Sequence, residues 1–402
     1  MFVDKIDELF QNASKYELEW CKMLKIRNPY VDNFPVHFSK KLPLFDGPAY
    51  RQYTEYNYVY DKLWVSKSQN KKCGTLDEIM NEKDKIEYPI FIKPRYGHKS
   101  ASSKGCYKIK NESELKKHLH KKKVMWSEFY EGNETMTDFI MVNGKIAHQI
   151  TYIYTQSKTS FTDEYKYISP KNKPPKKIEE WVNKNMKNFT GICNVQYKKN
   201  SIIEVGLRPA RGGAYLQSTN NDVLIKNINN VVEKNVWVFL EKDKLNFKPY
   251  YSFKCITRFP IIYLLPQQTI DILMYIMGVK PFYEYYFEPL GNDGSVFFQF
   301  LHDDFKTGME IKYTFELLFV SLQILFIVLF LIPIVLFFYF KKPLIAIIVL
   351  VLVTLLFSTK IINPIGSHYR LWKLHKQQMG FSNDKEDDED LLGSISHDNY
   401  IN

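Results

Sequence analysis

The sequence predicts an α+β protein whose C-terminal part is a transmembrane helical hairpin. Two observations predict this class. Short apolar strand patterns alternate with amphipathic helix patterns from about Tyr58 to Asn246, and a nearly uninterrupted apolar stretch begins at Leu317. The rest of the chain is polar, because the mean hydropathy is −0.31 despite that stretch. At roughly 100–200 residues per domain, 402 residues allow two or three folded units.

Short strands joined by tight turns are expected to dominate the body. Asn143-Gly144 and Lys199-Asn200 each separate two apolar runs, which is typical of β-hairpins. Residues 156–175 are rich in Lys and polar side chains and are predicted to be a loop. In chain order, the predicted strands are 88–94, 106–109, 124–130, 135–142, 145–154, 191–197 and 202–205, and the predicted helices are 112–122, 178–186 and a segment from Ala214 onward.

A smaller α/β subdomain is predicted after this body. Its strand–helix–strand pattern contains a helix over 267–277 and a hairpin turn at 291–294. The acidic tail after Gly380 is predicted to be disordered. The expected divisions are an N-terminal region (1–60), a central domain (61–246), the smaller subdomain (247–312), the hairpin (315–362) and the tail (363–402).

The apolar stretch is long enough to cross a bilayer. Residues 317–340 would form a helix of roughly 36 Å, against a hydrocarbon core of ~30 Å. Lys341-Lys342-Pro343 interrupts the stretch, and a second run over 344–357 is short unless Lys360 snorkels. Two spans and a re-entrant hairpin both place the ends of the segment on one side of the membrane. A buried hairpin in a soluble protein is the alternative.

The residues that flank the hairpin predict its orientation. Basic side chains near its ends favour a cytoplasmic body and tail, whereas the two lysines in the turn favour the opposite. Five cysteines are scattered and never spaced as CxxC, which indicates a reducing compartment and excludes a disulfide framework or a zinc site of that type. The flanking basic residues are Lys306, Lys312, Arg370, Lys373 and Lys376.

The net charge of +11 suits three kinds of contact. Anionic lipid, a polyphosphate ligand and plain solvent are all compatible with a basic surface. The sequence has no zinc-finger spacing, aromatic RNA-binding motif or basic recognition helix, so no nucleic-acid partner is expected.

A lysine at the end of an apolar strand is the first candidate site feature. Lys93 closes the run that begins at Tyr88, and a loop of small residues follows as far as Lys104-Gly105. Small residues let backbone amides approach a phosphate, and a lysine adds positive charge. A solvated lysine is the alternative. Nearby carboxylates at Glu128 and Glu134 can bind ribose hydroxyls or a metal, or simply face solvent.

Two polar residues in adjacent apolar strands form the second feature. Gln196 and Glu204 are expected to lie close together across the predicted hairpin. Oxygen ligands of this kind suit Mg²⁺, which also bridges substrate phosphates. Arg208 and Arg211 follow, where they can clamp an anionic group. A hairpin with an incidental carboxylate is the alternative.

These pieces together resemble the ATP-grasp superfamily, and within it the carbamoyl-phosphate-synthetase-like branch. The resemblance runs from Asp61 to about Gly213 and more loosely to residue 310. It implies two α+β subdomains that grip ATP, with residues 1–60 as a reduced preceding domain. The segments that carry it are DKLW at 61–64, YPIFIKPRYGHKSASSKG at 88–105, SEFYEGNET at 127–135, GICNVQY at 191–197 and IIEVGLRPARGG at 202–213.

The resemblance assigns the nucleotide contacts to three groups. The two lysines at 62 and 93 match residues that hold the ATP phosphates, and the loop over 100–105 matches a flexible phosphate cover. Residues 128–130 match a hinge that receives adenine through its backbone, and Glu134 matches the ribose-binding carboxylate. The residues so assigned are Lys62, Lys93, Ser102, Ser103, Lys104, Gly105, Glu128, Phe129, Tyr130 and Glu134.

The resemblance also assigns metal and catalytic roles. Gln196 and Glu204 match Mg²⁺ ligands, and Arg208, with Arg211 beyond it, matches the arginine that steadies an acyl phosphate. One position departs from the family pattern. The family usually has an Asn two residues after the glutamate, and here that position is Gly206. A glycine side chain cannot coordinate a metal, so the second metal position is in doubt.

The implied function is a membrane-anchored, Mg-ATP-dependent ligase that activates a carboxylate as an acyl phosphate for attack by an amine. Two alternatives stay open. The domain can be a catalytically degenerate ATP-binding sensor or scaffold, as Gly206 indicates, or the body can be a spacer of a membrane-structural protein. A complete carbamoyl-phosphate synthetase is not expected, because one ATP-grasp unit and no glutaminase nucleophile motif are present.

Overall fold

The computed structural model describes residues 36–81, 86–97, 105–156, 163–239, 241–257, 274–281, 288–289, 295–341 and 343–351. The described chain forms two compact units, one that ends at Tyr250 and one that begins at Tyr251. Both contain helices and antiparallel strands, so the α+β prediction is confirmed.

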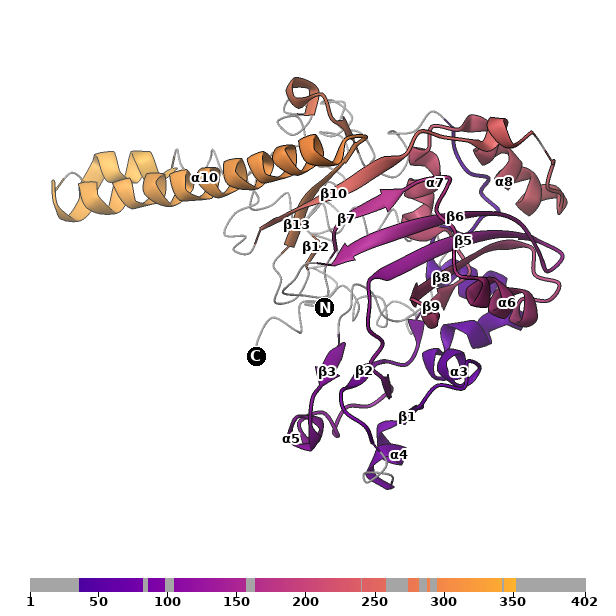
Figure 1. The fold of residues 1–402 in the computed structure, drawn as a ribbon. Helices are drawn as coiled ribbons and strands as arrows, with labels where there is room; N and C mark the ends of the chain where they lie inside the picture. Colours follow the sequence, from indigo (N-terminus) through magenta and orange to yellow (C-terminus); the bar gives the residue numbers. More distant parts are fainter. Residues whose placement is uncertain are drawn as a thin grey trace, which may run out of the picture. The chain divides into compact units, whose positions relative to one another are not determined.

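A four-stranded antiparallel sheet forms one lobe of the first unit (Figure 1). Its strands lie in the order β1-β4-β2-β3. Helices α4 and α5 accompany it, and the apolar core of this lobe includes Ile92 and Trp126. The element bounds are β1 Cys73–Thr75, α4 Leu76–Asn81, β2 Ile90–Pro94, β3 Tyr107–Ile109, α5 Glu112–Lys116 and β4 Val124–Glu128.

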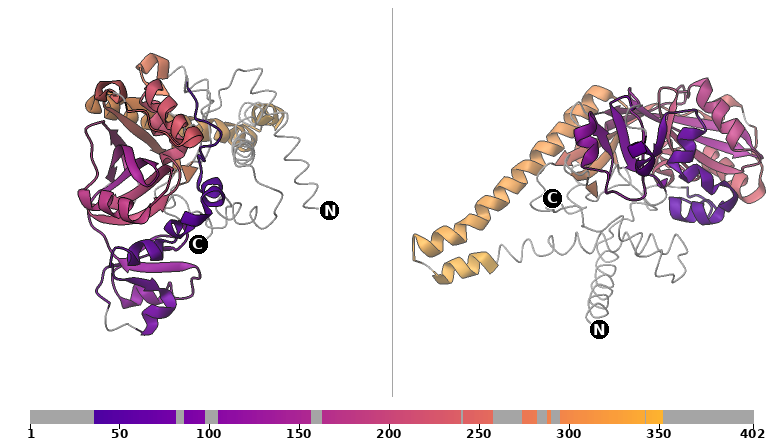
Figure 2. Two further views of the ribbon diagram at one scale, coloured as in Figure 1. Left: turned by 90° about the vertical axis from the view of Figure 1, so that its right-hand side faces the viewer. Right: turned by 90° about the horizontal axis from the view of Figure 1, so that it is seen from below.

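A larger antiparallel sheet forms the second lobe of the same unit (Figures 1 and 2). Its order is β7-β6-β5-β8-β9. One face packs on α6 and α3 through a core that contains Phe139, Val195 and Trp181. The element bounds are α3 Lys62–Lys67, β5 Glu134–Val142, β6 Lys145–Gln156, β7 Asp163–Ile168, α6 Lys176–Asn185, β8 Gly191–Lys198 and β9 Ser201–Gly206.

The N-terminal helices belong to this unit as well. The residues of α2 (Asp46–Gln52) and η1 (Thr54–Tyr60) contribute Ala49 and Tyr60 to the core beneath the larger sheet. The Tyr60 hydroxyl also accepts a 3.0 Å hydrogen bond from the Leu207 backbone N–H, which fixes the chain just after β9. This hydrogen bond ties the segment that ends at Tyr60 to the chain just after β9.

Most predicted elements of this unit are present, with three corrections. The predicted loop over 156–175 contains β7, whose consecutive residues from Tyr165 to Ile168 pair antiparallel with β6. The predicted helix over 112–122 ends at Lys116. From Ala214 the chain forms α7 (Ala214–Ser218) and then α8 (Asp222–Lys234), because the Asn221 side chain caps a new helix.

The second unit contains a small sheet and a long helix. Strand β13 (Ser295–His302) pairs with β10 (Tyr250–Thr257), β11 (Lys280–Pro281) and β12 (Glu288–Pro289). Residues 274–277 are helical, and the other residues of the predicted 267–277 helix lie outside the described residues. The same is true of the predicted turn at 291–294 and the tail over 363–402.

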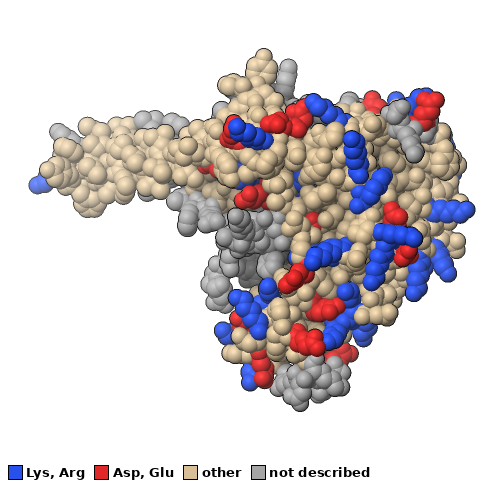
Figure 3. Space-filling view, in the orientation of Figure 1, with Lys and Arg blue, Asp and Glu red and all other residues tan. Residues whose placement is uncertain are grey.

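Helix α10 (Phe305–Phe338) has a docked first part and an exposed second part. In the first part Phe315 and Phe319 are buried, Gln323 donates to Thr257, and the buried Lys312 ammonium lies 2.7 Å from the Glu316 carboxylate. From residue 324 the helix exposes a nearly uncharged apolar surface (Figure 3). The helix is long and apolar enough to cross a membrane.

The docked first part of α10 contains Lys312, one of the basic residues from which the membrane orientation was predicted. Because Lys312 is buried and ion-paired, it is a poor flanking charge for lipid headgroups. Arg370, Lys373 and Lys376 lie outside the described residues. Residues 343–351 are helical again, and the hairpin itself stays a prediction.

A buried carboxylate joins the larger sheet to the loop that follows β9. Asp138 on β5 is fully buried and accepts hydrogen bonds from the Tyr152 hydroxyl at 2.8 Å, the Asn194 amide at 2.7 Å and the Ala210 backbone N–H at 3.0 Å. Burial raises the pKa of Asp138 to about 6, although these donors oppose the shift. The loop η4 (Ala210–Gly213) is therefore tied to the sheet.

Substituting Asp138→Ala is expected to lower the free energy of unfolding by about 3 kcal/mol or more, because it leaves several buried donors unsatisfied. Urea unfolding followed by circular dichroism measures the change. The control is Glu131→Ala at an exposed position, with an expected change within about 0.5 kcal/mol. Equal effects of the two substitutions would contradict the structural role of Asp138.

Candidate functional site

A β-bulge in β9 sets which side chains face the candidate site. Tyr197 pairs with Ile202 and Gln196 pairs with Glu204, so the register skips Ile203. Ile202 faces the core, and the extra residue turns Glu204 to the opposite face. The predicted proximity of Gln196 and Glu204 is thereby confirmed as a cross-strand pair.

Two buried lysines reach this part of β9. The Lys93 ammonium, from β2 in the small lobe, donates a 2.8 Å hydrogen bond to the carbonyl oxygen of Ile203, the bulged residue. The Lys62 ammonium, from the start of α3, lies 3.3 Å from a Glu204 carboxylate oxygen. The structure therefore brings Lys62, Lys93, Gln196 and Glu204 together, at the point where the two lobes of the first unit meet.

An ion pair that the sequence did not reveal positions Lys62. Arg95 donates from Nε and Nη2 to the two carboxylate oxygens of Asp61, at 2.9 and 2.6 Å. The Lys62 backbone N–H also donates to the Arg95 carbonyl at 2.9 Å. A Cβ on Gly97 would lie 3.1 Å from a Glu204 oxygen, so a glycine lets this loop approach the carboxylate closely.

Burial perturbs two of the predicted groups. It lowers the pKa of Lys93 from 10.5 to about 8, and the nearby Lys62 charge adds to this while Glu204 opposes it. Burial also raises the pKa of Glu134 to about 7, helped by Asp163 and opposed by Lys198 and Lys166. Strong shifts of this kind are typical of functional sites, although ion-pair networks also produce them.

The predicted hinge residues form a separate group at the end of β4. The backbone N–H of Glu128 donates to the Lys72 carbonyl and that of Phe129 to the Pro89 carbonyl, so these two amides are already used within the lobe. Lysines surround the group: Lys71 lies 3.4 Å from the Glu128 carboxylate and 5.0 Å from the Tyr130 ring centroid.

The register of β2 and β4 fixes the distance between the hinge group and Lys93. Ile90 pairs with Glu128, and Lys93 pairs with Met125. Three residues of strand therefore separate the two groups, or roughly 10 Å along the sheet. This spacing is comparable with the length of a nucleoside.

The two predicted arginines occupy different surroundings. Arg208 donates from Nη2 to an Asp46 carboxylate oxygen at 2.8 Å, so its charge is already paired. Arg211 lies in η4 with the left-handed φ of 48°. In the predicted phosphate cover, Ser102, Ser103 and Lys104 lie outside the described residues. Gly105 is described and has a φ of 71°.

The donor set of this face fits Mg²⁺ in one respect. Gln196 and Glu204 offer hard oxygen donors side by side, and a half-buried carboxylate at Asp46 lies near Glu204's strand. Within the described residues, no group of three or more His, Cys, Asp or Glu side chains can hold a metal. The arrangement suits an ion that keeps waters and phosphate oxygens as ligands.

Several residues of this site were missed at the level of sequence. Three of them, Asp61, Arg95 and Asp46, form ion pairs with residues distant in the chain, and no sequence motif marks such pairs. Lys166 was missed because its strand was predicted to be a loop; its buried ammonium lies 2.6 Å from the Asp163 carboxylate and 4.2 Å from the Tyr154 ring centroid. The β-favouring residues Tyr165, Tyr167 and Ile168 were the available signal.

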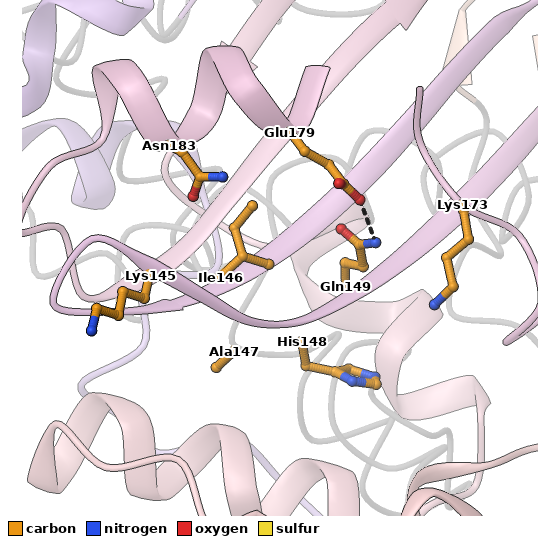
Figure 4. Close-up of a pocket in the computed structure, with 8 residues that line it drawn as sticks. All are labelled: Lys145, Ile146, Ala147, His148, Gln149, Lys173, Glu179 and Asn183. Atoms are coloured by element: carbon orange, nitrogen blue, oxygen red, sulfur yellow. Dashed lines mark hydrogen bonds between the residues drawn. The ribbon is translucent and has the colours of Figure 1, made fainter. Parts of the chain in front are cut away.

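A separate pocket opens between β6 and α6 (Figure 4). Within it the Gln149 amide donates to Glu179 at 2.8 Å. The ring of the lining residue His148 stacks on Trp237. Burial and the Lys173 charge lower the pKa of His148 to about 4. The pocket contains none of the predicted site residues. Its lining consists of Lys145, Ile146, Ala147, His148, Gln149, Lys173, Glu179 and Asn183.

Comparison with known proteins returns enzymes that join molecules. No family model matches the sequence. The chain is 33% identical over 109 residues to a D-alanine–D-alanine ligase of Petrotoga mobilis, a match that covers 24% of this chain and 36% of that relative. The chain thus spans little more than a third of the curated relative.

Two solved structures show a distant likeness. N5-carboxyaminoimidazole synthetase from Staphylococcus aureus, complexed with ADP, is 14% identical with a TM-score of 0.45, covering 64% of this chain and 71% of that one. L-amino acid ligase from Bacillus licheniformis is 12% identical with a TM-score of 0.43, covering 64% and 70%.

Substituting Lys93→Met is expected to raise the free energy of unfolding at pH 7 by about 2 kcal/mol, because removing the buried charge gains roughly 3 kcal/mol and losing the hydrogen bond to Ile203 costs about 1 kcal/mol. The penalty is complete below the folded-state pKa of about 8 and disappears as the pH rises toward the unfolded-state value of 10.5. The advantage of the variant should shrink over this range in urea unfolding.

The control for this prediction is Lys67→Met, at an exposed position on α3. It is expected to change stability little at any pH. A Lys93→Met protein that is less stable than the wild type by the same amount at pH 7 and pH 10 would contradict the predicted cost of burying Lys93.

Proposed function

We propose that this protein is an ATP-grasp ligase that uses Mg-ATP to join a carboxylate to an amine or similar nucleophile. The observation that carries the proposal is the junction of the two lobes, where Lys62 and Lys93 converge on the Glu204 bulge. Two buried lysines beside a carboxylate that can bind Mg²⁺ form a binding site for polyphosphate. The order of the five sequence segments and the sequence match to a ligase support it.

The reaction divides into two displacements. A carboxylate oxygen attacks the γ-phosphorus of ATP, ADP leaves, and an acyl phosphate forms. The amine nitrogen then attacks the acyl carbon, inorganic phosphate leaves, and the nitrogen loses a proton. Bound Mg²⁺ supplies charge neutralisation to the phosphates, with Gln196 and Glu204 as its protein ligands.

The protein's own side chains act mainly by position and charge. Lys62 and Lys93 attract and orient the phosphates. The hydrogen bond from Lys93 to the Ile203 carbonyl fixes the position of its ammonium group. Glu134 faces the ribose, and the hinge at Glu128, Phe129 and Tyr130 receives the adenine. Arg208 and Arg211 steady the acyl phosphate, with Arg208 oriented by Asp46.

We further propose that the exposed part of α10 anchors the enzyme in a membrane, with the ATP-binding body and the tail in the cytoplasm. An apolar helix surface that begins at residue 324 supports this. Retention of the full chain in membranes after alkaline extraction tests the anchor. The acceptor can be lipid-linked, or the anchor can serve location alone.

A second candidate is an ATP-binding module without turnover. Gly206 and the pairing of Arg208 with Asp46 favour it, since both reduce the groups free to act on a substrate. Such a module would bind nucleotide tightly and release no ADP.

Nucleotide affinity is expected to fall as the pH rises through about 8, because only the protonated Lys93 attracts phosphate. The decrease should approach about tenfold per pH unit above that value. Calorimetric titration of the full chain in detergent with a non-hydrolysable ATP analogue, from pH 7 to 9.5, measures it. Lys93→Met should bind weakly with no step near pH 8; a step that persists in this variant would assign the titration elsewhere.

Turnover is tested by ADP release from the full chain in detergent with Mg-ATP and mixed carboxylates and amines. We expect substrate-dependent release of ADP. Glu204→Gln should lower its rate by about 100-fold or more, because the proposed Mg²⁺ site loses its carboxylate ligand. The matched control is Glu131→Gln, an exposed glutamate of the same segment as the hinge. Tight ATP binding without release in any mixture would favour the second candidate.

A further inference from the structure

The space beside Gly206 is filled by a side chain from a distant part of the chain. Gly206 and Glu204 pair with Asn194 and Gln196, alternate residues of β8, so positions 204 and 206 share one face of the sheet. A Cβ on the buried Gly206 would lie only 2.8 Å from Oδ1 of Asp46. The Asp46 carboxylate therefore occupies the volume that a side chain at position 206 would take.

Asp46 is held in this position by its other oxygen. Its Oδ2 accepts the 2.8 Å hydrogen bond from Arg208, while Oδ1 is the oxygen turned toward Gly206. The residue begins α2, and the next helical segment, η1, is fixed to the end of β9 by the hydrogen bond between Tyr60 and Leu207. The Asp46 carboxylate therefore lies on the sheet face that carries Glu204, and 23% of the Asp46 side chain is exposed.

We propose that Asp46 supplies the second carboxylate of the Mg²⁺ site, in place of a side chain at position 206. The inference rests on the proposed function. A glycine at 206 admits the Asp46 carboxylate, and Oδ1 then lies on the same face as Glu204 and Gln196. Mg²⁺ in phosphate-transfer sites takes one or two carboxylates, and its remaining ligands are waters and phosphate oxygens.

The charges of the site accommodate this second carboxylate. Lys62 pairs with Glu204 and Arg208 pairs with Asp46, so each carboxylate has a cation beside it. The positive charges of Lys62 and Arg208 offset the negative charges of the two carboxylates while no metal is bound. An ion pair alone would explain the contact with Arg208, but it would not require the Asp46 carboxylate to fill the side-chain volume of position 206.

A swap of ligands tests the inference. Asp46→Ala should weaken Mn²⁺ binding to the complex with a non-hydrolysable ATP analogue by about tenfold or more, because a metal ligand is lost. The double variant Asp46→Ala, Gly206→Asn should recover most of this loss, since an amide oxygen then stands on the same face. Electron paramagnetic resonance of Mn²⁺ in the full chain measures affinity and stoichiometry.

A second variant separates metal binding from folding. Asp46→Asn keeps an oxygen acceptor for Arg208 but removes the charge, so it should fold as the wild type does and still bind Mn²⁺ more weakly. Thermal melting followed by circular dichroism confirms the fold of each variant. Nucleotide binding in EDTA should change little in all of them.

The outcomes are distinct. If Asp46→Ala binds Mn²⁺ within about twofold of the wild type, or if the double variant is as weak as the single one, Asp46 serves only Arg208 and the inference is overturned. If the wild type binds no nucleotide with or without Mn²⁺, the ATP proposal and this inference fall together.

Discussion

Ile203 is the residue that the register of β8 and β9 skips, and this one extra residue turns β9 over between Ile202 and Glu204. Without it, strict alternation would keep Glu204 on the same face as Ile202, which packs in the core. The bulge also presents the Ile203 carbonyl to Lys93 from the small lobe. The bulge at Ile203 therefore sets the face on which the Glu204 carboxylate lies, and it also joins the two lobes of the first unit.

The same sheet separates stability from function by its two faces. Phe139, Cys193 and Val195 point into the apolar core on one side, while Glu134, Gln196 and Glu204 lie on the other. Polar groups on the second face are held by buried hydrogen bonds, as Asp138 shows for η4. Lys93 reaches this sheet from β2 of the small lobe and is also held by a hydrogen bond, to the Ile203 carbonyl, while its burial lowers its pKa.

Much of the first unit was predictable because its signals are local. The Asn143-Gly144 turn and the strands around it follow from side-chain alternation and turn residues, whereas the direct pairing of Gln196 with Glu204 depends on the bulge. Strand β7 was hidden by the Lys- and Pro-rich residues around it, and α5 ended early because hydrogen bonds of the i→i+3 type replace the α-helical pattern after Lys116. Asp46 could not be found, since the segment that contains it has no motif and its target is 160 residues away.

The sequence by itself determined the α+β class, the apolar stretch of α10, and the residue types from which a phosphate and metal site can be built. Periodicity, turn chemistry and composition act over a few residues, so a single sequence carries them openly. Only the tertiary structure decided that Glu204 faces Lys62, that Lys93 crosses between lobes, and that Asp46 stands at the vacant side-chain position of Gly206. These contacts join residues far apart in the chain, and close packing selects them only after the local elements have formed.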